Sequence, residues 1–211
     1  MRLTKLSPSQ KIQGRWLAQL EDGTLLSLGE GEVAAFGLYT GMELDGATLE
    51  RLDQAARTAR VKEKALSLIA RRPMSRKELL EKLTRPGRTG QPFATQEEAE
   101  GAAHRLAELG YLDDRAYARQ LAQQGRAKGY GDRRIRDELY RHGVPRDCWE
   151  EALEGLEPPQ GAIDAFVAKR LAGWDGDPKT LKRTADALAR RGYGWEEIRD
   201  ALERYQSALE D

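Results

Sequence analysis

From about residue 48 onward, apolar residues recur every three or four positions, the spacing of a helix that buries one face. Leu49 and Leu52 begin a pattern that continues to Pro73, where a proline cannot extend a helix. The sequence therefore predicts one long or slightly broken helix that ends at Arg71-Arg72-Pro73. Its first part, residues 48–59, is expected to be a connecting helix.

The first 47 residues follow a different pattern, with three short apolar runs at Leu3–Leu6, Ile12–Leu20 and Thr24–Leu28. Runs of this length indicate strands, and Asp22-Gly23 between the last two favours a hairpin turn because glycine accepts a positive φ. A short helix is expected near residues 33–36. Residues 1–47 are thus predicted to form a small β-rich cap.

Two capping boxes open the next helices, Ser75 with Glu78 and Thr95 with Glu98. Between these helices, residues 84–92 are rich in glycine and proline, which predicts an irregular loop.

The helical pattern then repeats along the chain. Gly143-Val144 and Gly192-Tyr193 are equivalent stops that lie 49 residues apart. Matching positions of the second helix of each unit also correspond: Leu79 and Leu83, Ile135 and Leu139, Thr184 and Leu188. We predict a mainly α fold of three tandem three-helix repeats, residues 60–112, 113–157 and 160–208, that form an elongated curved array after the β-rich segment.

The central stretch, Gly110 to Val144, reads as two basic helices separated by glycines. Asp113 and Asp114 are both expected to cap the first helix. Helical geometry places Arg115, Arg119 and Arg126 on one stripe of it. The second helix is predicted to bury Ile135 and Leu139 and to turn four arginines outward: Arg133, Arg134, Arg136 and Arg141.

Charge follows the repeat, although 35 basic and 35 acidic residues cancel over the chain. Residues 115–146 hold nine Lys/Arg and three Asp/Glu, whereas residues 147–165 hold none and six. The other two units alternate in the same sense. If the units stack in register, their basic parts form one stripe that suits a phosphate backbone or an acidic protein groove. The alternative is that the opposite charges neutralise each other on solvated faces.

The residues indicate no enzyme, cofactor or metal site. His104 and His142 lack metal-ligand spacing, His142 is expected at a helix C-terminus, and Cys148 is expected to be buried and inert. Five tyrosines near helix ends are more typical of core or cap residues than of base-stacking ones. With no secretory or membrane-spanning segment and one cysteine, the sequence predicts a cytoplasmic protein, and the lack of a heptad pattern favours a monomer.

Three segments carry a resemblance to a known family: Leu109 to Asp114, Lys128 to Leu139, and the run from Arg71 to Leu79. With Leu188 to Tyr193 as further support, the chain from about 57 to 205 resembles the RecX family of bacterial recombination regulators. The loop from Thr84 to Phe93 is longer than the family's usual connection.

The resemblance implies a negative regulator that binds the RecA protein and lies in the groove of the RecA–DNA filament. There it would inhibit ATP hydrolysis, strand exchange and filament growth, with weak contacts to the DNA phosphate backbone. The alternative is a nucleic-acid-binding helical module that regulates transcription or DNA repair, with residues 75–109 as a helix-turn-helix. Basic residues of the matching segments and of the predicted stripe are the candidate filament-binding residues: Arg71, Arg72, Arg76, Lys77, Arg115, Arg119, Arg126, Lys128, Arg133, Arg134 and Arg136.

Overall fold

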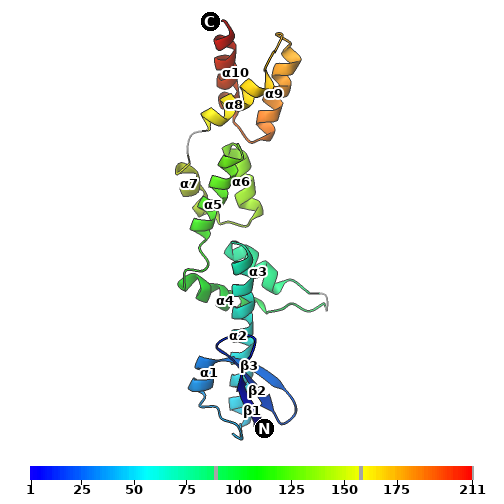
Figure 1. Cartoon of the computed structure of the whole chain (residues 1–211), viewed down its shortest axis with the longest axis vertical. Helices are drawn as coiled ribbons and strands as arrows, with labels where there is room; N and C mark the ends of the chain where they lie inside the picture. Colours follow the sequence, from blue (N-terminus) through cyan, green and yellow to red (C-terminus); the bar gives the residue numbers. More distant parts are fainter. Residues whose placement is uncertain (88–89, 157–158, 211) are drawn as a thin grey trace. The chain divides into compact units, whose positions relative to one another are not determined.

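The computed structural model describes residues 1–87, 90–156 and 159–210, and it is mainly helical, as predicted. The chain forms two compact units. One comprises Met1–Arg72 and Leu79–Leu112, and the other comprises Pro73–Glu78 and Asp113–Asp211. Figure 1 labels the helices and strands of both units.

Three antiparallel strands in the order β1-β2-β3 form the predicted N-terminal sheet: β1 Leu3–Pro8, β2 Arg15–Leu20 and β3 Leu25–Gly29. The expected turn at Asp22-Gly23 is confirmed, with Gly23 at a φ of +85° and an Asp22 carboxylate that accepts from Thr24 N. The second strand begins at Arg15 rather than Ile12 because the chain turns at Gly14, where φ is +75°. The expected short helix, α1, spans Glu30–Ala35.

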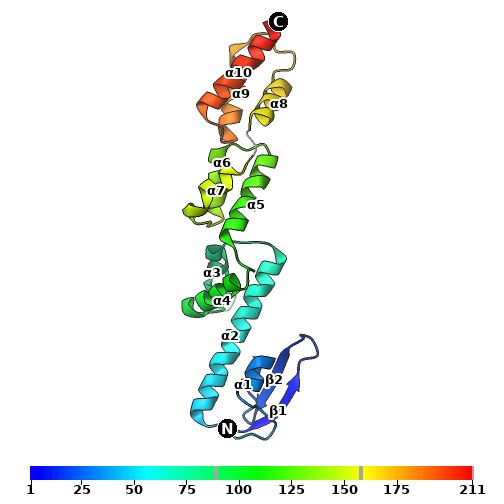
Figure 2. The ribbon, with the colours of Figure 1, turned by 90° about the vertical axis from the view of Figure 1, so that its left-hand side faces the viewer.

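The predicted long helix is α2, Gly46–Arg71, which runs beside the sheet (Figures 1 and 2). It begins two residues before Thr48, because Asp45 accepts a hydrogen bond from Thr48 N at 2.7 Å and serves as the N-cap. Its N-terminal part closes a core with the sheet, whose fully buried members include Leu3, Leu28 and Leu52.

Helices α3 (Arg76–Thr84) and α4 (Gln96–Glu108) follow. The capping box of Thr95 and Glu98 is confirmed in both directions. The loop between the helices is irregular, as predicted. Among its described residues, Pro86 and Pro92 form an isolated β-bridge, and Gly87 N donates to Gln91 O at 2.9 Å.

The remaining helices form two three-helix groups. The middle group, which includes a 3-10 turn (η1), has a core around Ile135 and Leu139, and the C-terminal group has a core around Val167, Leu188 and Ile198. The middle group consists of α5 Asp114–Ala127, α6 Asp132–Arg141, η1 Arg146–Cys148 and α7 Trp149–Glu154. The C-terminal group consists of α8 Gln160–Arg170, α9 Pro178–Arg190 and α10 Trp195–Glu210.

The equivalent glycine stops are confirmed at the ends of α6 and α9. Gly143 and Gly192 have φ values of +67° and +90°. The following residue folds back each time, with Val144 N bonded to Leu139 O at 3.0 Å and Tyr193 N to Leu188 O at 3.3 Å. The repeated helix-ending motif read from the sequence is therefore a repeated structure.

The second helices of successive groups meet end to end. At the first junction, the turn after α6 lies against the start of α3, where Ser75 Oγ donates to His142 O at 2.6 Å and accepts from Glu78 N at 3.1 Å. At the second junction, the turn after α9 lies against the start of α6. There Gly131 N donates to Arg191 O at 2.9 Å and Arg133 N donates to Gly192 O at 3.2 Å. Each junction brings the negative end of one helix to the positive end of the next.

Candidate partner-binding surface

The arginines of α5 do not share one surface. Arg115 and Arg119 both bind the carboxylate of Glu151 on α7, at 2.6 and 2.7 Å. The hydrogen bond that Arg115 donates to Glu151 raises the pKa of Arg115. Arg126 instead has a side chain only 14% exposed, which binds Asp132 at 2.6 Å and donates to Tyr130 O at 3.1 Å. Helical geometry still places the three residues on one stripe of α5, but Arg126 is largely buried because its side chain ties the end of α5 to the start of α6.

The arginines of α6 also divide into two kinds. Arg133 is exposed, as predicted, whereas Arg134 and Arg136 are half-buried rather than turned fully outward. Arg134 binds Glu138 at 3.3 Å and lies over the ring of Tyr130, and its backbone packs on Gly192. Arg136 binds Glu150 of α7 at 3.3 Å. Arg141 is exposed and pairs with Glu138.

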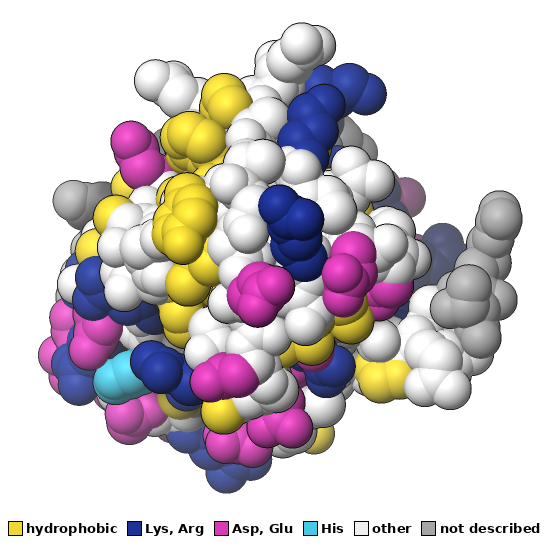
Figure 3. Space-filling view, turned by 90° about the horizontal axis from the view of Figure 1, so that it is seen from below, with side chains coloured by type: hydrophobic (Ala, Val, Ile, Leu, Met, Phe, Trp, Pro, Cys, Tyr) yellow, Lys and Arg dark blue, Asp and Glu magenta, His cyan; other side chains and the backbone are white. Residues whose placement is uncertain are grey.

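Several basic residues of the middle group are thus neutralised by the acidic residues near its end. Arg115, Arg119 and Arg136 all bind glutamates of α7. This arrangement favours the neutralisation alternative over a continuous basic stripe for these three. Figure 3 views the molecule from below, and on that face basic, acidic and hydrophobic side chains are interspersed.

Lys128 and Arg133 are the exposed candidates of the middle group for which no carboxylate partner lies within the described residues. The structure brings both to the turn after α9. Lys128 O accepts from Arg191 Nη1 at 3.3 Å, and Arg133 N binds Gly192 O. Sequence reasoning did not select Arg191, which also lies over the ring of Phe166 at 4.6 Å. Its only sequence signal was its place before the equivalent glycine stop.

The candidates near the start of α3 lie in both compact units. Arg71 and Arg72 are exposed at the end of α2 in the first unit. Arg76 and Lys77 open α3 in the second unit, where the aliphatic chain of Lys77 packs on Gly143. The aliphatic part of the Lys77 side chain therefore covers the junction, while its ammonium group stays in solvent.

Asp114 does not cap α5 as predicted, although its neighbour does. Asp113 accepts from Ala116 N at 3.0 Å, whereas Asp114 reaches across the first junction and accepts from Arg76 N at 2.8 Å. Burial raises the pKa of Asp114, and the negative charges of Asp113 and Asp147 raise it further. Asp114 therefore caps α3 from another helix, a role that sequence neighbours alone did not reveal.

The other titratable residues provide local packing contacts. His142 ends α6, as expected, and its Nδ1 lies 3.1 Å from the hydroxyl of Tyr117. Cys148 is buried, as expected, and burial raises the pKa of its thiol. Across the described ranges, no three His, Cys, Asp or Glu side chains gather as a metal site would require. Nor does any helix there have the length and apolar character needed to cross a membrane.

The linked three-helix groups and their partly neutralised basic face define a helical-repeat protein. A family model described as RecX, second three-helix domain, matches residues 113–153, which span α5 to α7. Curated relatives named regulatory protein RecX match much more of the chain. The relative from Stenotrophomonas maltophilia is 34% identical over 141 residues, 66% of this chain and 83% of its own length. The relative from Vibrio vulnificus is 34% identical over 145 residues, 67% of this chain and 90% of its own length. The chain belongs to the RecX family of regulatory proteins.

Solved structures agree on the fold. A crystal structure of regulatory protein RecX matches 96% of this chain and 98% of its own, with a TM-score of 0.74 and 19% identity. The crystal structure of RecX from Lactobacillus salivarius matches 71% of this chain and 97% of its own, with a TM-score of 0.62 and 17% identity. The recognition from sequence and the predicted mainly α fold class are confirmed.

Proposed function

We propose that the protein is a negative regulator of the RecA recombinase. It binds in the groove of the RecA–DNA filament and inhibits RecA ATP hydrolysis, strand exchange and filament growth. Membership in the RecX family supports this proposal, since its curated members carry the name of a regulatory protein. The binding is carried by protein and phosphate contacts in the cytoplasm, without a cofactor.

One observation supports the choice of contact residues. Lys128 and Arg133 are exposed around one turn, and within the described chain neither has a carboxylate partner. A partner's acidic or phosphate groups can therefore bind them without first breaking an ion pair. Arg115, Arg119 and Arg136 would each have to give up a glutamate of α7. We accordingly rank Lys128 and Arg133 first among the candidates of the middle group.

The test measures DNA-dependent ATP hydrolysis by RecA in the presence of the purified protein. We expect inhibition at amounts below one molecule per RecA. The double variant Lys128→Glu, Arg133→Glu should need at least about tenfold more protein for half-inhibition, because juxtaposed like charges oppose binding. Its thermal unfolding should match that of the wild type, since both side chains are exposed.

The control is the double variant Arg105→Glu, Arg199→Glu, which changes the net charge equally. These two arginines are exposed and pair with Glu108 and Asp200. The control should inhibit RecA like the wild type. Equal loss in both variants would mean that net charge rather than this turn governs binding. A wild-type protein that leaves RecA unaffected but binds one duplex sequence tightly would favour the nucleic-acid-binding alternative.

A further inference from the structure

A basic pocket of about 520 Å³ lies in the first compact unit, where α2, the end of α3 and the following loop meet. The described residues that line it include four cations on these separate elements and no Asp or Glu. They are Arg60, Lys64, Lys82, Arg85, Gly87, Gln91, Pro92 and Phe93. None of the four cations belongs to the candidate filament-binding set.

Described residues of the loop between α3 and α4 build one wall of this pocket. The bridge between Pro86 and Pro92 folds the loop back on itself, and Ala94 N donates to Leu83 O at 3.1 Å. These contacts fix Phe93 beside α2, where its ring lies 5.0 Å from the guanidinium carbon of Arg60 and 5.7 Å from Lys64 Nζ. The aromatic ring thus helps to hold two cations, one turn apart on α2, at the mouth of the pocket.

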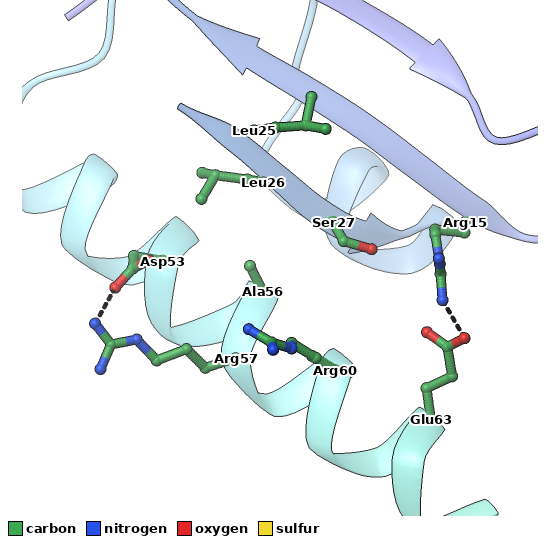
Figure 4. A pocket seen from close by; sticks show the side chains of 9 residues that line it. All are labelled: Arg15, Leu25, Leu26, Ser27, Asp53, Ala56, Arg57, Arg60 and Glu63. Carbon is green, nitrogen blue, oxygen red and sulfur yellow. Dashed lines mark hydrogen bonds and ion pairs between the residues drawn. The ribbon is translucent and has the colours of Figure 1, made fainter. Parts of the chain in front are cut away.

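In a neighbouring pocket, two arginines pair with carboxylates of the same chain (Figure 4). There Arg15 pairs with Glu63, and Arg57 pairs with Asp53 at 2.6 Å, so each of these cations is neutralised within the chain. Arg60 lines both pockets. In contrast, Arg60, Lys64 and Arg85 form no ion pair with a carboxylate anywhere in the described part of the chain.

We propose that this pocket binds the phosphate groups of a nucleic-acid backbone without reading the base sequence. Arg60, Lys64 and Arg85, which converge without carboxylate partners in the described part of the chain, attract an anion with several charges, and successive phosphates supply these at regular spacing. The cations are exposed and spread over α2, the end of α3 and the loop, which suits an extended strand more than one small enclosed anion. Phe93, 37% exposed, adds an apolar edge beside the strand.

This inference goes beyond the RecA proposal, because the pocket would bind a nucleic acid with no recombinase present. The two can therefore fail separately. A protein that does not inhibit RecA could still bind a strand here, and an inhibitor of RecA could lack this contact.

The test is fluorescence anisotropy of a labelled single strand of about 16 nucleotides, titrated with full-length protein over a series of salt concentrations. Each phosphate contact to a single strand contributes about 0.7 to the slope of log affinity against log salt. The triple variant Arg60→Gln, Lys64→Gln, Arg85→Gln should therefore lower the slope by up to about 2. The matched control, Arg105→Gln, Arg199→Gln, Arg204→Gln, removes three exposed arginines that have carboxylate partners and should keep the wild-type slope.

Further measurements distinguish a nucleic-acid backbone from other anions. A labelled duplex that shows the same change of slope supports a backbone site for either form of nucleic acid. Displacement of the strand by inorganic pyrophosphate at micromolar concentration would point to a small-anion site and overturn the proposal. Equal slopes for the triple variant and its control would also overturn it, as would displacement by polyglutamate as effective as that by unlabelled DNA. Circular dichroism should give the same helical content for both variants.

Discussion

Replacement of Gly131 by alanine should open the junction between α6 and α9. The φ of Gly131 is −78°, which any residue can adopt, so the substitution introduces no backbone strain of its own. The obstacle is the neighbouring turn. An added Cβ would lie 2.5 Å from the carbonyl carbon of Gly192 and 2.6 Å from Tyr193 N. The turn must therefore move away by about 1 Å to restore normal contact distances.

Such a movement breaks the hydrogen bonds of the junction. The bonds from Gly131 N to Arg191 O and from Arg133 N to Gly192 O are 2.9 and 3.2 Å long, and an extra 1 Å takes both out of range. At about 0.5–1.5 kcal/mol for each bond, the expected loss is about 1–3 kcal/mol for local opening.

Hydrogen exchange measures this loss directly, because the Arg133 amide belongs to the first turn of α6 and bonds across the junction. Its exchange should be about 5- to 150-fold faster in the variant. Amides in the middle of α2 should exchange as in the wild type.

Gly101→Ala provides the matched control. Gly101 lies within α4, and an added Cβ there meets nothing within 4 Å. This substitution should stabilise the protein by about 0.5–1 kcal/mol, because alanine is the better helix former. Unchanged exchange of the Arg133 amide in Gly131→Ala would refute the inferred role of the junction.

Three further predictions follow from the same contacts. Asp114→Ala should destabilise the protein by about 1 kcal/mol in urea unfolding, as the loss of a helix cap does, whereas Asp114→Asn keeps an oxygen for Arg76 N. Because burial raises the pKa of folded Asp114 above its ordinary 3.8, its contribution to stability is greatest when it is protonated and declines as pH rises through the folded pKa. Asp114→Asn should abolish this decline, which begins near pH 3.8. Arg126→Ala should cost about 1–3 kcal/mol because it leaves Tyr130 O and Asp132 without their donor, whereas Arg119→Ala, at an exposed ion pair, should leave the denaturation midpoint unchanged. Cys148 should react with a thiol reagent at least about 100-fold more slowly in the folded protein than in urea, since its thiol is buried and its pKa is raised; equal rates would contradict its burial.

The elements that depend on local sequence were predictable. The capping box at Thr95, the hairpin turn at Gly23 and the glycine stops at Gly143 and Gly192 each depend on residues within about six positions. Periodicity likewise identified α2 and the buried positions of α6, because a helix that packs on one side repeats its apolar residues. These features place the three-helix groups but do not fix how their side chains pair.

The candidate surface was less predictable because its charges are set by distant residues. The partner of Arg115 and Arg119 is Glu151, more than 30 positions away, and helical geometry within α5 gives no sign of it. Asp113 and Asp114 are equally plausible caps in sequence, yet only the hydrogen bond that Arg76 N donates to Asp114 assigns one aspartate to each helix. The basic pocket was missed for the same reason, since Arg60 and Arg85 are 25 positions apart and line one pocket only in the folded chain.

The end-to-end junctions make the starts of α3 and α6 depend on a different part of the chain. Helix α6 has no side-chain cap of its own at Gly131, whereas α9 begins with Asp177, whose carboxylate accepts from Lys179 N at 3.1 Å. A chain truncated after residue 156 would therefore leave the first backbone N–H groups of α6 without their acceptors. A serine or aspartate at position 131 should restore a cap and stabilise the truncated chain. Gly131 permits close contact in the intact chain, but it leaves the start of α6 without a side-chain cap once the C-terminal group is removed.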